Sequence, residues 1–341
     1  MDYSKSPALP RKLLNVTIAS FRTPHEGCVM RRREHRIFLL LGIIALLIFA
    51  ADPREKTERQ AAAGATMETI SLGVVSEKPR ERIEEYRDFV NYLAQKLSSS
   101  SSSRGKVVVA RTPHELGRLL QEKKVDFYME SPYPTFLINE QTGGKLLLRR
   151  WKRGVGEYRS ILFTRRDSGV TRLEDLVGKM IAFEDPGSTS GYFLPKVFLL
   201  RKGFTLTEKT SFRANVSPQE IGYVFAHGSE ENITNWVLLR RVVAGALSSN
   251  DLDELDEKRR AAIAILAETE TVPRHLLSVR KDWDPALVNR LREVLLSIHE
   301  DDEGRKVLRK ADKTTKFDLL PGGEEMMYHK IRELFLLFQG R

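Results

Sequence analysis

Three hydroxyl-bearing residues, Ser188, Thr189 and Ser190, follow one another in this chain between two glycines. The apolar run at 180–183 before them predicts a short buried strand, and residues 192–202 after them predict a helix. A helix start offers unpaired backbone N–H groups and the positive end of the helix dipole, and hydroxyls add donors that rotate toward a ligand. The stretch therefore predicts a pocket for a small tetrahedral oxyanion, although a serine that only caps the helix is an equally good interpretation.

The composition is that of a folded protein with little excess charge outside its N-terminus. The chain has 341 residues, of which 41% are hydrophobic and 30% charged, enough for two lobes of ordinary size. Its formal net charge is +10. Residues 1–51 hold eight Lys/Arg against three Asp/Glu, which is half of that charge. The thin basic excess of the remainder argues against a nucleic-acid-binding surface.

An apolar segment near the N-terminus predicts export. Residues 37–51 carry no charge and follow the arginine-rich run at 31–36, which is the pattern of a signal peptide or membrane anchor within 30–51. Ile48 and Phe49 stand where a cleavage site needs small residues. We therefore favour an anchor in the inner membrane over a cleaved signal, with the rest of the chain on the periplasmic side.

The segments around this run are predicted to lie outside the folded part. Residues 1–29 are expected to be disordered or to precede a true start at Met30, and 52–68 form a polar tether. The single cysteine, Cys28, precedes the apolar run. The exported part consequently has no cysteine for a disulfide or a lipid.

From residue 69 onward, predicted strands alternate with predicted helices, which indicates an α/β fold with largely parallel sheets. A second junction between a strand and a helix, also rich in hydroxyls, lies at 130–135. The predicted strands include 68–75, 106–110, 125–129, 180–183 and 242–247, and the predicted helices include 78–97, 113–123, 217–226, 232–240, 285–299 and 324–338.

The stretch from residue 69 to about residue 320 resembles the phosphate/phosphite/phosphonate-binding proteins of ABC transporters. The likeness is carried by the segments at 158–163, 167–170, 173–179 and 183–192. It implies a periplasmic-binding-protein fold of type II, in which two α/β lobes joined by two crossing strands hold a ligand in their cleft. Lobe one would comprise residues 69–157 plus 248–341, and lobe two residues 158–247.

The same resemblance implies a set of ligand-binding residues. The serine and threonine trio would hold the oxyanion, and the junction at 130–135 would face it from lobe one. Two tyrosines have an equally good interpretation as packing residues. The implied residues are Ser188, Thr189, Ser190, Ser131 and Tyr133, with Tyr86 as a weaker candidate at the cleft rim.

One part of the predicted site departs from the family pattern. The family carries a Ser-His pair and, further along, an Asp, and both His and Asp contact the ligand. By our alignment Glu230 replaces the His, Val243 replaces the Asp, and His227 is out of register. An ionised Glu230 would repel a dianion, and Val243 would leave a ligand amine without a partner. We therefore expect weak binding of 2-aminoethylphosphonate.

Two functions follow from these patterns. The first is a solute-binding protein that captures a small oxyanion and delivers it to an ABC permease in the inner membrane. The second is a membrane-tethered module for ligand sensing or scavenging, with altered specificity and a sensor partner. The sequence shows no nucleophile–base pair, no metal-spaced His/Cys cluster and no glycine-rich nucleotide loop. We accordingly expect neither an enzyme nor a cofactor, a metal or a nucleic-acid partner.

Overall fold

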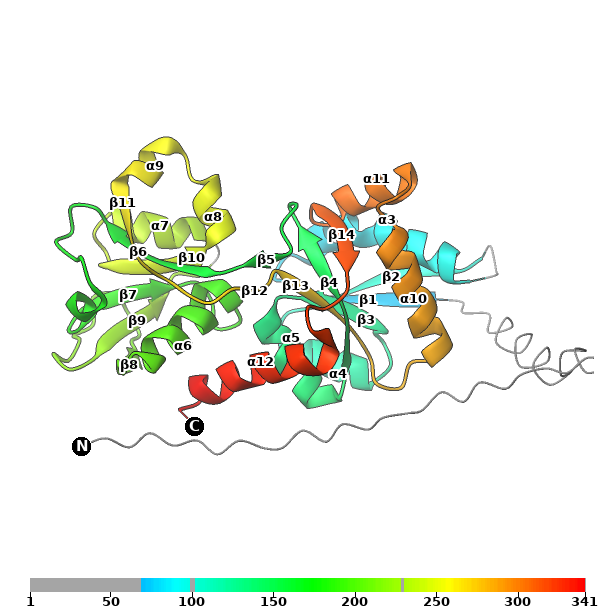
Figure 1. Cartoon of the computed structure of the whole chain (residues 1–341), viewed down its shortest axis with the longest axis horizontal. Coiled ribbons are helices and arrows are strands. Elements are labelled where there is room, and N and C mark those ends of the chain that lie inside the picture. The colour runs from blue at the N-terminus through cyan, green and yellow to red at the C-terminus, as the bar shows by residue number, and fades with distance from the viewer. Residues whose placement is uncertain (1–68, 99–101, 228–229, 341) are drawn as a thin grey trace, which may run out of the picture. The chain divides into compact units, whose positions relative to one another are not determined.

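The computed structural model describes residues 69–98, 102–227 and 230–340 (Figure 1). Two six-stranded sheets organise these residues into two lobes. The predicted leader, anchor and tether lie outside the described residues. In the part of the chain that the structure describes, no helix has the length and apolarity needed to cross a membrane.

Lobe one is built on the sheet with the strand order β14-β4-β13-β3-β1-β2. β1 pairs in parallel with both β2 and β3, whereas β13 and β14 pair antiparallel with β4. Phe89 and Leu93 of α3 are fully buried in the largest apolar core of this lobe. The strands are β1 Thr69–Val75, β2 Arg104–Ala110, β3 Phe127–Glu130, β4 Lys145–Lys152, β13 His275–Val279 and β14 Thr314–Asp318. The helices are α3 Pro79–Leu97, α4 Pro113–Gln121, α5 Pro132–Thr142, α10 Pro285–Ser297 and α11 Asp302–Lys310.

Lobe two is built on the sheet with the strand order β11-β6-β10-β7-β9-β8. The strands from β10 to β8 in this order pair in parallel, and β6 pairs antiparallel with β10 and β11. The strands are β6 Ser160–Arg165, β7 Met180–Phe183, β8 Leu206–Glu208, β9 Ile221–Phe225, β10 Ala244–Ser248 and β11 Ile263–Glu268. The helices are η1 Leu173–Leu176, η2 Thr189–Phe193, α6 Leu194–Arg201, α7 Glu230–Leu238, α8 Ser249–Glu254 and α9 Glu257–Ala262.

Three predictions about the fold are wrong in part. Both sheets are mixed rather than largely parallel, because chain returns such as β13 and β6 run antiparallel to their neighbours. The predicted helix at 217–226 contains the strand β9, which pairs in parallel with two neighbours and buries Ile221, Tyr223 and Val224. Residues 248–268 belong to lobe two rather than lobe one, because β11 completes its sheet beside β6.

The two lobes are connected by paired strands and by the C-terminal helix. β5 (Glu157–Tyr158) and β12 (Val272–Pro273) pair antiparallel between the two sheets (Figure 1). α12 (Gly323–Phe338) packs on α5 of lobe one and on α6 of lobe two. At its end, the Phe338 ring lies 5.5 Å from the ring of Tyr133 and 5.3 Å from that of Phe193. The C-terminal helix thus fastens the two lobes on the side of α5 and α6.

Candidate anion-binding site

The hydroxyl-rich loop lies between β7 and α6, as the sequence predicts. Ser188 caps η2: its Oγ accepts the N–H of Gly191 at 2.9 Å and donates to the carboxylate of Glu184 at 2.7 Å. Thr189 and Ser190 are buried. A Cβ at residue 191 would approach the Glu184 side chain to 2.6 Å, so the loop needs glycine there. The first turn after the cap is π-helical, a form often found at functional sites.

The start of α5 in lobe one faces this loop. Thr189 Oγ1 donates to Ser131 Oγ at 2.8 Å and accepts the Tyr133 N–H at 3.0 Å. The N–H groups in the first turn of a helix have no acceptor within the helix. Because Pro132 and Pro134 have no N–H, Tyr133 supplies the free backbone donor of this turn. Ser131 occupies the N-cap of α5 but makes no capping hydrogen bond with its side chain. Two helix starts from opposite lobes therefore meet at one point, an arrangement that favours an anion.

The two tyrosines that we predicted at the site differ in their positions. Tyr133 is at the junction of the lobes, where its ring stacks on Phe193 with 4.4 Å between ring centroids. Tyr86 is 3% exposed and packs inside lobe one. Its Oη lies 3.4 Å from Asp312 Oδ2, and its ring lies 5.8 Å from the Arg150 guanidinium. Tyr86 is accordingly a core residue and does not line a rim.

Two carboxyl groups that the sequence did not single out belong to the site. The pKa of Glu184 is raised to about 7, mainly by burial and also by the charges of Glu230 and Asp251, while the hydrogen bond from the Ser188 hydroxyl lowers it. In lobe one, burial raises the pKa of Glu130 to about 7, although its carboxylate accepts the Val75 N–H at 2.9 Å. Each glutamate stands at or just beyond the carboxyl end of a parallel strand, where ligand-binding groups gather in open α/β sheets. That position was the signal available in the sequence.

Glu230 and Val243 lie at opposite ends of lobe two. Glu230 is the first residue of α7 and is close enough to Glu184 for its charge to raise the pKa of that group. Val243 donates its N–H to Met180 O at 2.9 Å, beside the amino end of β7. The loop follows the carboxyl end of β7, so the assignment of Val243 to the ligand pocket is wrong. Val243 immediately precedes β10, which runs parallel to β7. The carboxyl end of β10, on the same side as the loop, carries Ser248.

His227, which our alignment placed out of register, lies against the loop. Its N–H donates to Glu184 O at 3.1 Å, and its Nδ1 is 3.0 Å from Asp185 Oδ1. Its backbone φ is 46°, which is unusual for a residue other than glycine. The structure therefore places an exposed imidazole beside Asp185, at the start of the loop.

Comparison with known proteins matches most of the chain to one protein family. Residues 72–320 match the family model described as "ABC transporter, phosphonate, periplasmic substrate-binding protein". The phosphate-import protein PhnD of Mycolicibacterium smegmatis is 25% identical over 206 residues. That match covers 59% of this chain and 61% of the length of the relative.

Solved structures extend the comparison. XAC2383 from Xanthomonas citri, solved with chloride, has a TM-score of 0.73 at 27% identity over 80% of this chain and 98% of its own. The same protein solved with ATP has a TM-score of 0.71 at 28% identity over 80% and 97%. PhnD1 from Prochlorococcus marinus, solved with methylphosphonate, shares the fold with a TM-score of 0.59 at 16% identity over 78% and 97%.

The family match spans both lobes and the junction where the two helix starts meet. Its members are exported solute-binding components of importers rather than enzymes. This chain belongs to the family of periplasmic substrate-binding proteins of phosphonate ABC transporters.

Proposed function

We propose that this protein captures a small oxyanion, such as a phosphate, phosphite or phosphonate group, between its lobes for an ABC permease. The observation that carries the proposal is the contact of Thr189 with Ser131 and Tyr133. It brings hydroxyl and backbone donors at the starts of α5 and η2 to one point. An oxyanion inserted there would accept from these groups in place of the bonds that they now make with each other.

The proposed ligand groups come from both lobes, so binding would couple to lobe closure. Ser188, Thr189 and Ser190 would act from lobe two, and Ser131 with the Tyr133 N–H would act from lobe one. Each hydrogen bond to a charged oxygen contributes on the order of 1–3 kcal/mol. Because both sets are needed, an anion bound to one lobe alone would be held weakly.

The carboxyl groups beside the loop would select the charge of the ligand. With a pKa of about 7, Glu184 is half protonated near neutral pH. Its protonated form can donate to an anion, and its ionised form repels one. Glu230 would meet a cationic part of the ligand, whereas the Asp251 carboxylate already accepts from Ser248 in the cap of α8. The expected weak binding of 2-aminoethylphosphonate rested on Val243, which is remote from the loop, so the position of this residue gives no reason for weak binding.

A second candidate function is a membrane-tethered sensing or scavenging module. It is favoured by the apolar run at 37–51, which lacks a good cleavage site. N-terminal sequencing of exported protein separates the two possibilities. A mature chain that starts near Ala51 in the soluble periplasm would contradict the tethered module, and retention of 37–51 in the inner membrane would support it.

The proposed site is tested by calorimetric titration with phosphate, phosphite, methylphosphonate, 2-aminoethylphosphonate, sulfate and ATP. ATP is included because XAC2383 was solved with it. For the ligand that binds best, Thr189→Ala should weaken binding at least about tenfold, which corresponds to about 1.4 kcal/mol. The matched control is Ser217→Ala, which removes an exposed hydroxyl before β9. Equal affinities for the two variants would contradict the proposed site.

A further inference from the structure

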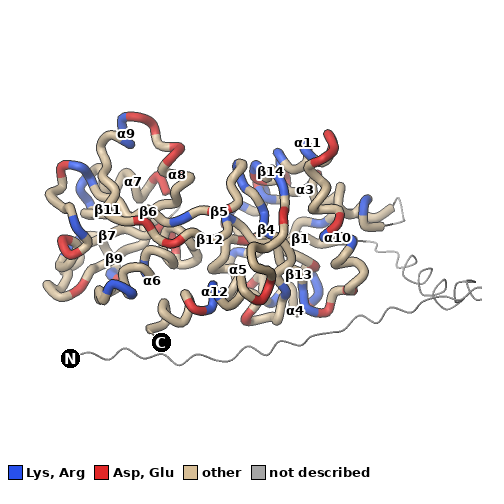
Figure 2. The backbone as a smooth tube through the Cα atoms, in the orientation of Figure 1, with Lys and Arg blue, Asp and Glu red and all other residues tan. Residues whose placement is uncertain are grey.

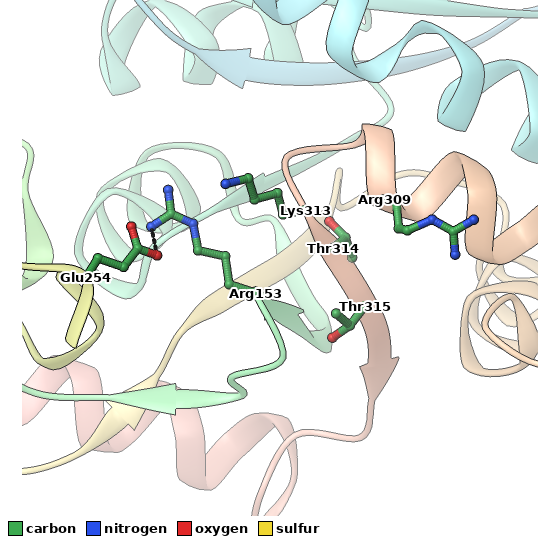
Figure 3. A pocket seen from close by; sticks show the side chains of 6 residues that line it. All are labelled: Arg153, Glu254, Arg309, Lys313, Thr314 and Thr315. Carbon is green, nitrogen blue, oxygen red and sulfur yellow. Dashed lines mark hydrogen bonds and ion pairs between the residues drawn. The ribbon is translucent and has the colours of Figure 1, made fainter.

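A pocket lies where lobe one meets the end of α8 in lobe two (Figure 3). It has a volume of about 490 Å³. None of its lining residues belongs to the loop at 184–191 or to the start of α5. The lining residues are Arg153 after β4, Glu254 of α8, Arg309 of α11, and Lys313, Thr314 and Thr315 at the start of β14.

The pocket is basic. Three cationic side chains and one carboxylate line it, which leaves a net charge of +2. Arg153 Nη1 pairs with Glu254 Oε1 at 2.5 Å. Neither Arg309 nor Lys313 pairs with a carboxylate among residues 69–98, 102–227 and 230–340. Figure 3 shows Lys313 reaching toward Arg153, whereas Arg309 points away from them at the edge.

The backbone under this pocket is held in an unusual conformation. Arg153, Asp312 and Lys313 have φ values of 55°, 52° and 52°, and the Arg153 N–H donates to Lys313 O at 2.8 Å. These are three of the six residues other than glycine with positive φ in the described part of the chain. Such residues persist where their surroundings hold them, and they cluster at ligand sites. Here Arg150 and Lys152 hold the Asp312 carboxylate at 3.1 and 2.7 Å.

The guanidinium of Arg153 is not fully used. Its Nε is shielded from solvent and has no hydrogen-bond partner among the described residues. Its observed partner is a carboxylate of the other lobe. A phosphate group presents several oxygens to the planar fork of an arginine and attracts a neighbouring ammonium. An anion with two or more charges would therefore suit this pair of cations better than the single Glu254 carboxylate does.

We propose that this pocket is a second anion site, independent of the hydroxyl loop, that takes a phosphate-bearing molecule larger than a simple oxyanion. Arg153 and Lys313 hold the phosphate, and Arg309 adds charge at the edge. The volume falls in the range of small-molecule sites, roughly 300–1,000 Å³, and leaves room for the body of the ligand. The incoming anion displaces Glu254 from Arg153, so the carboxylate competes with the ligand.

The test is calorimetric titration of the full chain with inorganic pyrophosphate at low ionic strength. Lys313→Asn should weaken binding about tenfold because it removes a charge-assisted bond. Asparagine suits the left-handed backbone at this position. Arg309→Gln should weaken binding by a smaller factor. Glu254→Gln should tighten it, which a purely structural role of Glu254 does not predict. The matched control is Lys306→Gln. It removes an exposed cation from α11, the helix of Arg309, at a position that does not line the pocket.

The outcomes also separate this inference from the proposed function. Thr189→Ala should leave pyrophosphate binding unchanged. Loss of that binding in Thr189→Ala, with normal binding in Lys313→Asn, would place pyrophosphate at the hydroxyl loop and overturn the second site while supporting the loop. Absence of binding to the wild-type chain, or equal effects of Lys313→Asn and Lys306→Gln, would also overturn it.

Discussion

The two lobes carry opposite charge at the edges that hold the proposed sites. Figure 2 shows Lys and Arg around β4 and β14 of lobe one, and Asp and Glu along α8 of lobe two. Lobe one contributes Lys152, Arg153 and Lys313, and lobe two contributes Glu184 and Glu254. Opposite charges on facing edges favour closure, and Arg153 with Glu254 is a visible instance.

The charged groups next to a buried carboxylate decide whether its pKa is lowered or raised. Burial alone would raise the pKa of Asp312, but Arg150 and Lys152 outweigh burial and lower it to about 2. Glu184 is surrounded by carboxylates and a hydroxyl, so the same burial raises its pKa to about 7. Burial therefore leaves Asp312 a fixed structural anion, because two cations hold it, whereas Glu184 in lobe two and Glu130 in lobe one titrate near neutral pH.

The largest effect is expected from breaking the ion cluster of lobe one. Asp312→Asn leaves Arg150, which is 0% exposed, without its counter-ion. Removing one partner of a buried ion pair costs about 3–5 kcal/mol. Urea unfolding should show this loss in the free energy of unfolding. Asp253→Asn is the control, since that side chain is 70% exposed. A loss no larger than that of the control would show that Asp312 is not needed to compensate Arg150.

In lobe two, removing a buried carboxylate should instead raise the free energy of unfolding, by a smaller amount. The pKa of about 7 for folded Glu184 exceeds its ordinary value of 4.5, so the native protein binds more protons than the unfolded chain between these values. The contribution of Glu184 to the free energy of unfolding is then greatest below pH 4.5 and is lost as pH rises through 7. Glu184→Gln should match wild type near pH 5 and exceed it at pH 8 by about 2 kcal/mol.

Unfolding curves at the two pH values measure this difference. Equal stability of Glu184→Gln and wild type at pH 8 would mean that ionising Glu184 does not destabilise the folded state.

The same carboxyl group should make oxyanion binding depend on pH. Between pH 6 and 8, the affinity of the wild-type chain should fall about tenfold as Glu184 ionises beside the ligand. Glu184→Gln should give a flatter profile. Sulfate is the preferred probe because its charge is constant in this range. For an oxyanion that itself titrates, the effect of its own protonation on affinity is the same for both proteins and cancels in their comparison. Parallel profiles for wild type and variant would remove Glu184 from the ligand site.

The smallest effect is expected from the ion pair between the lobes. Arg153 and Glu254 are 29% and 54% exposed, and such pairs contribute about 0–1 kcal/mol. Glu254→Gln should therefore change the free energy of unfolding by less than about 1 kcal/mol, and less still at high salt. Urea unfolding at two salt concentrations measures this change. A larger, salt-insensitive loss would indicate that the pair locks the lobes together.

Local sequence patterns determined the elements that carry the loop. The apolar run before Ser188 and the glycine at residue 203 delimit β7 and α6, because backbone preferences and caps act within a few residues. The same reasoning failed for β9. The spacing of Ile221, Val224 and Phe225 also suits a helix, and only pairing with β7 and β8 makes this segment a strand.

Long-range packing decided the chemistry of the site. Ser131 and Thr189 are 58 residues apart in sequence, and only the approach of the lobes brings their hydroxyls together. Spacing along β10 could not show which end faces the loop. The parallel register with β7 puts Val243 at the remote end. The pKa of Glu184 likewise depends on Glu230 and Asp251 from other elements, because Coulomb interactions follow distance in space rather than along the chain.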